Sequence, residues 1–126
     1  MDLDIIIPTY NREHLLKDCL RSVFAAARPK DLNITVVAVD NNSGDNTREV
    51  VQSFLELRDL PVRYIFVGRP GKSAALNEAL AQTEGEFVGL IDDDEQLDPA
   101  WFEVAYRELS AAAPVDYIGG PCHPNW

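Results

Sequence analysis

Short apolar runs alternate with segments of helical periodicity along the whole chain, and this alternation constrains the fold more than any other feature. The expected strands cover residues 3–9, 33–40, 62–67 and 87–91, and the expected helices cover residues 12–27, 47–57, 73–82 and 99–109. Asn11 is expected to cap the first helix, and Pro99 is expected to begin the last one. A fifth strand is expected to start within residues 116–119.

The order of these segments predicts an α/β fold. The runs at 33–40 and 87–91 are continuously apolar, as is typical of parallel strands that are covered on both faces. We therefore expect a three-layer α/β/α sandwich around a mostly parallel sheet, and the 126 residues suit one domain spanning 1–126. Ligands of such sheets bind beyond the carboxyl ends of the strands, so the polar residues there are the candidate site.

The composition of the chain limits which classes of molecule it is expected to bind. The chain has 21 acidic residues against 11 Lys and Arg, a formal net charge of -10, which argues against nucleic acid as the main partner. A nucleotide ligand remains compatible if a divalent cation supplies positive charge locally. The two cysteines, Cys19 and Cys122, are too few for a disulfide framework, and Cys19 is expected to be buried on a helix face. Neither a signal-peptide pattern nor a membrane-spanning run is present, so we expect a cytoplasmic location.

Three consecutive acids follow the fourth expected strand, namely Asp92, Asp93 and Asp94. If they stay extended, Asp92 and Asp94 point to one side, and two carboxylates about 6 Å apart repel by roughly 3 kcal/mol at an effective dielectric of about 20. A cation relieves this repulsion, and hard carboxylate oxygens favour Mg²⁺ or Mn²⁺. The alternative interpretation is a solvated acidic turn before a helix N-terminus.

The ends of the first two strands supply further candidates. Thr9 and Tyr10 could hold a base, or could simply end their strand. Asp40 could contact a ribose or base, or could cap its own loop as an Asx-turn. The residues after Asp40, which are Asn41, Asn42 and Ser43, are favoured as turn-formers.

The segment Gly71-Lys72-Ser73 opens a helix, where backbone N–H groups could face a phosphate and Lys72 could add charge. Asn77 lies one turn further along the same helix. A solvated surface position is an equally good interpretation of Lys72. The segment is not a P-loop, because Phe66 stands where the motif requires its first glycine.

Other nucleotide-binding and catalytic classes can be weighed on the same residues. The turn after residue 8 has no glycine, so the dinucleotide-binding G-x-G-x-x-G pattern is absent from it. A Mg²⁺-dependent phosphatase with a nucleophilic aspartate remains open, as does a binding module without catalytic activity.

Five segments together resemble glycosyltransferase family 2, whose members have the GT-A fold, a Rossmann-like arrangement. These segments are residues 6–12, 20–23, 39–47, 71–77 and 85–94, and their order and spacing carry the resemblance. The chain departs from the family pattern at Arg69, where asparagine is usual, and at Ala26, where glutamine is frequent. Both departures bear on the subfamily.

The resemblance implies transfer of a sugar from a nucleotide-diphospho-sugar, with a UDP-sugar as the leading expectation, to a hydroxyl of a carbohydrate, lipid or protein acceptor with inversion. The nucleotide-sugar-binding residues it implies are Pro8, Thr9, Tyr10, Asn11, Asp40, Lys72, Asn77, Asp92 and Asp93. Thr9 would lie at the edge that binds the base, and Asp40 would hydrogen-bond that base. Asp94, together with Asp92, would bind Mn²⁺ or Mg²⁺.

The resemblance also implies what this chain lacks. The family's general base lies beyond its fifth strand, so we expect it beyond Trp126, and we expect this chain to be the donor-binding part of a longer enzyme. Many family members act at the cytoplasmic face of a membrane, which implies a peripheral location there. A sheet edge left uncovered by the absent acceptor-binding part would favour self-association.

Overall fold

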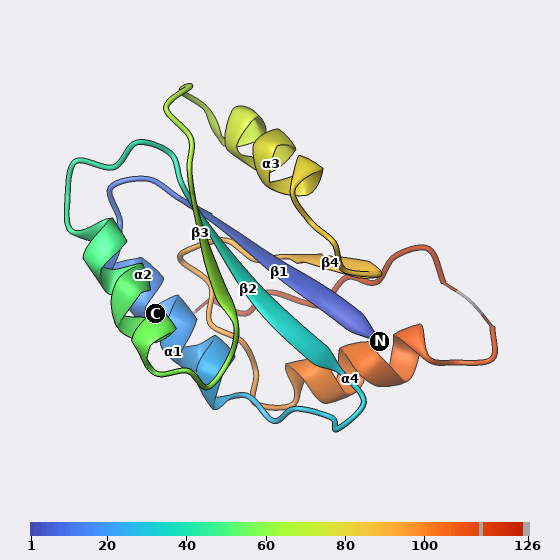
Figure 1. Cartoon of the computed structure of the whole chain (residues 1–126). Helices are drawn as coiled ribbons and strands as arrows, with labels where there is room; N and C mark the ends of the chain where they lie inside the picture. Colours follow the sequence, from blue (N-terminus) through green and yellow to red (C-terminus); the bar gives the residue numbers. More distant parts are fainter. Residues whose placement is uncertain (114, 125–126) are drawn as a thin grey trace.

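The computed structural model describes residues 1–113 and 115–124, and within them it forms the three layers of an α/β sandwich (Figure 1). The sheet contains β1 (Asp2–Thr9), β2 (Asn33–Asp40), β3 (Val62–Phe66) and β4 (Phe87–Leu90). The helices are α1 (Glu13–Ala25), α2 (Thr47–Glu56), α3 (Lys72–Ala81) and α4 (Trp101–Leu109). The expected α/β class and the order of the first eight elements are confirmed.

All strand pairs are parallel, and their order across the sheet is β3-β2-β1-β4. The chain first builds outward from β1 to β3 and then crosses back over the sheet to β4. Because parallel crossovers are right-handed, this change of direction puts α3 on the opposite face from α1 and α2. Figure 1 shows α3 on one side of the sheet and α1, α2 and α4 on the other. The change also creates a crevice beside the carboxyl end of β1, where such sheets bind ligands.

The central strand β1 contributes side chains to the hydrophobic clusters on both faces of the sheet. Ile5 and Ile7 pack with α1 and α4 residues in the larger hydrophobic cluster, while Ile6 packs on the other face against Ala75 and Ala79 of α3. All three isoleucines are fully buried. The two alanines leave room for the α3 backbone to lie close to the sheet, which brings the first turn of α3 near the end of β1.

Strand β4 departs from the expectation that both of its faces are covered. Val88 is 39% exposed and Leu90 is 58% exposed, whereas the whole of β2 beyond its first residue is buried or half-buried. The reason is that β4 is an edge strand, and α3 packs on β1 and β2. The fifth strand expected at residues 116–119 is also absent from the described structure. These residues are exposed, and no described strand pairs with them.

Helix boundaries differ from expectation where the capping group comes from another loop. Asn11 does not cap α1, because it has a positive φ of 51° and its side chain accepts a hydrogen bond from Gly44 instead. The N–H of Glu13 donates to the Asp45 carboxylate, 3.1 Å away, in the loop before α2. Pro99 lies in the turn before α4, which begins at Trp101. None of the helices in the described ranges has the length and hydropathy needed to cross a membrane.

Candidate functional site

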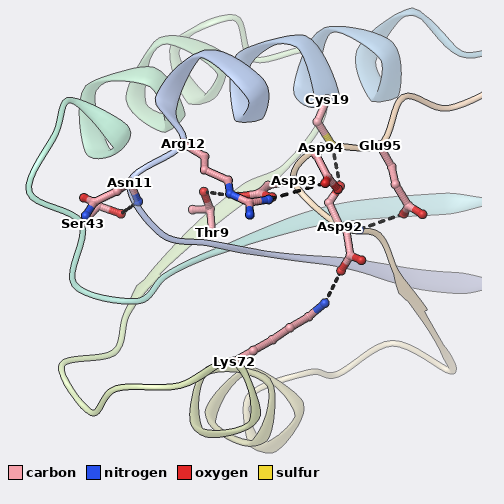
Figure 2. Close-up of polar contacts among 10 residues, drawn as sticks. All are labelled: Thr9, Asn11, Arg12, Cys19, Ser43, Lys72, Asp92, Asp93, Asp94 and Glu95. Carbon is pink, nitrogen blue, oxygen red and sulfur yellow. Dashed lines mark hydrogen bonds and ion pairs between the residues drawn. The ribbon is translucent and has the colours of Figure 1, made fainter. Parts of the chain in front are cut away.

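The three acids after β4 form a turn. Ile91 N–H still donates to the Ile6 carbonyl of β1, at 3.1 Å, and the chain then leaves the sheet. The N–H of Glu95 donates to the Asp92 carbonyl, at 3.0 Å, which closes a turn over residues 92–95. The extended arrangement considered from the sequence is therefore wrong, because these residues have left the sheet and satisfy their backbone groups locally. Asp93 is buried at the centre of this acid turn, while the Asp92 and Asp94 side chains are about half exposed (Figure 2).

The buried Asp93 carboxylate has a partner on each oxygen. Thr9 Oγ1 donates to Oδ2 at 2.9 Å, and Arg12 Nη1 donates to Oδ1 at 3.2 Å. A buried charge of this kind is tolerated only when it is paired and hydrogen-bonded, so these two donors hold the acid turn against the end of β1. Thr9 is itself buried, and its hydroxyl is used by Asp93.

Two cations meet the acid turn from opposite sides (Figure 2). Arg12 Nη1 extends beyond Asp93 to Asp94 Oδ2, at 3.5 Å, and Lys72 Nζ pairs with Asp92 Oδ1. The hydrogen bond to Asp92 is the main cause that raises the pKa of Lys72 above its ordinary value. Arg12 was not singled out from the sequence. The feature of the sequence that could have identified Arg12 is its position three residues after Thr9, the last residue of β1, at the same sheet edge as the acids.

The end of β2 is occupied by its own loop. Asp40 is buried, with Oδ1 accepting from Ser43 N–H at 2.9 Å and Oδ2 accepting from the Tyr64 hydroxyl at 2.6 Å. The first of these bonds is the Asx-turn considered from the sequence. Burial, followed by the hydrogen bond to Asp40, raises the pKa of Tyr64.

Asn41 does more than form a turn. Its Nδ2 donates to the carbonyls of Val67, at 3.1 Å, and Arg69, at 2.7 Å, while its Oδ1 accepts from Gly71 N–H at 3.0 Å. One buried side chain thus fixes the loop that enters α3, and with it the position of Lys72. Its neighbour Asn42 has a φ of 63°, as expected of a turn-forming asparagine.

The loops after β1 and β2 are hydrogen-bonded to each other. Asn11 N–H donates to Ser43 Oγ at 3.0 Å, and Gly44 N–H donates to Asn11 Oδ1 at 2.7 Å. Asp45 joins α1 to α2, since it accepts from the backbone N–H groups of Glu13 and Thr47 and from the Thr47 hydroxyl. Burial acts to raise the pKa of Asp45, but these hydrogen bonds outweigh it and lower the pKa below its ordinary value.

Two adjacent cavities open at this edge, with volumes of about 390 and 290 Å³. The residues implied by the sequence that line the larger cavity are Pro8, Thr9, Tyr10, Lys72, Asp92, Asp93 and Asp94. Arg12 and Asn41 line it as well. Asn77 is exposed on α3 and lines neither cavity, because it lies on a different side of the helix from Ala75 and Ala79, which face the sheet. Asn11 and Asp40 also lie outside both linings and act within the surrounding loops.

Comparison with known proteins identifies the family of this chain. Residues 4–125 match the family model described as glycosyl transferase family 2. The chain belongs to this family. A Haloferax volcanii relative, glycosyltransferase AglE, is 30% identical over 118 residues, which cover 94% of this chain and 38% of the relative. A Campylobacter jejuni relative, the GalNAc(5)-diNAcBac-PP-undecaprenol beta-1,3-glucosyltransferase, is 38% identical over 97 residues, covering 75% of this chain and 30% of the relative.

Solved structures of glycosyltransferases share the fold. A mannosyltransferase from Pyrobaculum calidifontis, solved with GDP-Man and Mn²⁺, matches with a TM-score of 0.75 and 31% identity, covering 87% of this chain and 32% of that one. Staphylococcus aureus TarS, solved with UDP-GlcNAc, matches with a TM-score of 0.71 and 28% identity, covering 97% and 37%. The chain has the GT-A fold of these neighbours. It spans between 15% and 42% of the length of the curated relatives it matches.

The residues of this family-2 chain fit a divalent cation that is held jointly with a ligand. Within the described ranges, no cluster of three or more His, Cys, Asp or Glu side chains is arranged to hold a metal ion alone. Asp92 and Asp94 nevertheless present half-exposed carboxylates to the larger cavity. Carboxylate oxygens suit Mg²⁺ and Mn²⁺, and Mg²⁺ is commonly bound by one or two carboxylates plus substrate phosphates.

The two cysteines lie beside the acid turn. Cys19 is buried on α1, as expected, and its Sγ lies 3.6 Å from the Asp92 carbonyl. Burial raises the pKa of its thiol to about 12, with the nearby Asp93 adding to the effect. Cys122 is exposed, and its Sγ donates to Glu95 Oε1 at 3.3 Å, which places the C-terminal segment against the same loop.

Proposed function

We propose that residues 1–126 are the single donor-binding domain of a glycosyltransferase that transfers a sugar from a nucleotide-diphospho-sugar to an acceptor hydroxyl. The observation that carries the proposal is the acid turn, which opens into a cavity also lined by Arg12 and Lys72. Such a cavity offers carboxylates for a divalent cation and basic groups for a diphosphate. When bound, the cation would neutralise charge on the diphosphate leaving group.

Different residues of the cavity would bind different parts of the donor. Asp94 and Asp92 would hold the Mn²⁺ or Mg²⁺, while Arg12 and Lys72 would face the diphosphate. Tyr10, 57% exposed at the end of β1, would place its ring against the base. Asp40 would contact a base only by accepting a hydrogen bond in addition to those from Ser43 and Tyr64.

The donor is proposed to be a UDP-sugar, with a GDP-sugar as the competing choice. TarS was solved with UDP-GlcNAc and the Pyrobaculum mannosyltransferase with GDP-Man and Mn²⁺, which supports a nucleotide-sugar but leaves the base to experiment. The proposed reaction proceeds with inversion. In this proposal the residues of the cavity bind and orient the donor, and none of them is assigned the role of the general base that deprotonates the acceptor.

The proposals for the acceptor and for the cellular location are based on the names of two relatives. The Campylobacter jejuni relative and a Pseudomonas fluorescens relative, the undecaprenyl-phosphate 4-deoxy-4-formamido-L-arabinose transferase, carry polyprenol-linked compounds in their names. We therefore propose a lipid-linked acceptor ahead of a soluble carbohydrate or a protein. A peripheral position at the inner face of a membrane would follow.

The test is calorimetric titration of UDP, GDP and dTDP into the chain, with and without Mn²⁺. We expect one nucleotide to bind in a Mn²⁺-dependent way and Asp94→Ala to abolish the Mn²⁺ dependence. Asp18→Ala is the matched control, because Asp18 is an exposed acid on α1 paired with Arg21. If no nucleotide binds to the folded chain under either condition, or if Asp94→Ala binds as well as the wild type, the proposed donor site is wrong.

A further inference from the structure

Each of the three aspartates of the acid turn already faces a cation of the protein. Arg12 contacts both Asp93 and Asp94, and Lys72 contacts Asp92. The two cations come from separate elements, because Arg12 precedes α1 and Lys72 is the first residue of α3. Both line the larger cavity together with the three acids, so the site holds its own counter-ions (Figure 2).

The two cations of the protein make this cavity a poor site for a divalent cation by itself. Two cations against four carboxylates, counting Glu95 in the same turn, leave two net negative charges. A divalent cation alone could balance this charge, but at Asp94 or Asp92 it would lie close to Arg12 or Lys72, which repel it and already occupy these carboxylates. A diphosphate that enters with the cation reverses this, since it supplies negative charge and offers oxygens that Arg and Lys both bind.

The solvent exposure of these ion pairs shows which of them can break when a ligand binds. Asp93 is buried and holds two protein donors, so it stays in place. The Arg12 and Lys72 side chains are 52% and 59% exposed, and their partners Asp94 and Asp92 are about as exposed. Exposed ion pairs contribute little free energy, so Lys72 can leave Asp92 and Arg12 can leave Asp94 at small cost, while Arg12 keeps its hydrogen bond to buried Asp93.

We propose that Arg12 and Lys72 are internal counter-ions of the acid turn that make divalent-cation binding depend on the nucleotide diphosphate. Without a donor, they neutralise Asp94 and Asp92. With a donor, they contact the diphosphate and release these carboxylates to the cation. This inference rests on the proposed function of the site and adds a coupling between its two ligands, which is reciprocal by thermodynamic linkage.

The coupling can be measured with Mn²⁺ itself, without any catalytic assay. Free Mn²⁺ is followed by its electron paramagnetic resonance signal, first with Mn²⁺ alone and then with saturating UDP or GDP. Arg12→Gln and Lys72→Gln each remove one counter-ion, and each is expected to bind Mn²⁺ alone about tenfold more tightly than the wild type. The factor by which the nucleotide tightens Mn²⁺ binding should fall correspondingly. Arg12→Lys, which keeps the charge, should stay close to the wild type.

Two controls keep the result interpretable. Arg21→Gln makes the same charge change on α1 but affects an exposed pair with Asp18, so its Mn²⁺ binding should not change. Arg12→Gln also takes a donor from buried Asp93, so its fold is checked by circular dichroism. If it unfolds, Lys72→Gln carries the test, because Lys72 and Asp92 are both exposed to solvent.

The outcomes separate the two proposals. If the wild type binds nucleotide with Mn²⁺ while the Gln variants bind Mn²⁺ alone no more tightly than the wild type, the counter-ion inference is overturned and the donor site stands. If the wild type binds no nucleotide with or without Mn²⁺, both are overturned. Tighter Mn²⁺ binding in both Gln variants, with a smaller effect of the nucleotide, supports the inference.

Discussion

Thr9→Val tests whether the acid turn is held in place by one buried hydroxyl. The substitution removes the donor that lies 2.9 Å from Asp93 Oδ2, and it keeps the branched shape of a side chain that is only 3% exposed. A hydrogen bond to a charged group contributes about 1.5–3 kcal/mol, and here its loss leaves a buried carboxylate oxygen without a partner. For a chain of this size, each kcal/mol corresponds to about 4 °C in Tm, so we expect Tm to fall by about 6–12 °C.

The assay is thermal unfolding followed by circular dichroism at neutral pH, checked by urea denaturation. Thr9→Ser keeps the hydroxyl and loses only a methyl group, so it should lose less than half as much stability as Thr9→Val. Asp93→Asn combined with Thr9→Val should cost less than the sum of the single changes, because the two residues share one interaction. A Thr9→Val protein within about 1 °C of the wild type would refute the reasoning. So would a Thr9→Ser protein as unstable as Thr9→Val, since the methyl group would then be responsible.

Three further predictions concern stability and reactivity. Gly85→Ala should cost about 1–3 kcal/mol, because the added Cβ would lie 3.0 Å from backbone atoms of Asp4 and Phe87, whereas Gly119→Ala, with open space around its Cβ, should leave urea unfolding unchanged. Asp45→Asn should cost about 1–2 kcal/mol at neutral pH, because charged caps of two helices are weakened. Folding lowers the pKa of Asp45, so its contribution to stability is present above the ordinary value of 3.8 and is lost as the pH falls. The free energy of unfolding of Asp45→Asn should therefore decrease less than that of the wild type between neutral and acid pH. An equal decrease in the two proteins would contradict this. A thiol reagent at mild alkaline pH should modify exposed Cys122 well before Cys19, although the hydrogen bond to Glu95 raises the pKa of Cys122. Cys19 should react only on unfolding, because it is buried and burial raises its pKa to about 12; two thiols that react at the same rate in the native chain would show that α1 is not packed as described.

Self-association stays a prediction, although its structural basis is now specific. Val88 and Leu90 are exposed on β4, and β4 is an edge of the sheet. An exposed apolar edge strand is the feature that favours pairing with another chain. Light scattering on the purified chain would decide the matter, and a sharp monomer peak at high concentration would count against it.

Local periodicity was sufficient to predict where the helices and strands lie in the sequence, but not how deeply each one is buried. The apolar run at 87–91 and that at 33–40 look alike in the sequence, yet β2 lies in the interior of the sheet and β4 lies at its edge. Position in a sheet depends on strand order, which is a property of the whole chain. For the same reason Asn11 was wrongly expected to cap α1, since the group that does so, Asp45, lies 32 residues away from Glu13.

The candidate site shows the same division. The sequence predicted which edge of the sheet carries the candidate site, because polar residues gather after the strands and the carboxyl ends of parallel strands meet. It did not show that Thr9 and Arg12 serve the buried Asp93, or that Asn41 holds the loop before Lys72. These contacts join segments 26 to 84 residues apart, and their geometry depends on loops that no periodic pattern describes.

The sequence by itself determined the α/β class, the family and the acids of the candidate site, because these depend on residue type, order and local spacing. Only the tertiary structure decided which acid is buried, which cations meet the acid turn and which strand is left uncovered. The physical reason is that burial and pairing of charge depend on neighbours in space. Here those neighbours are brought together by the return of the chain from β3 to β4 on the far side of β1.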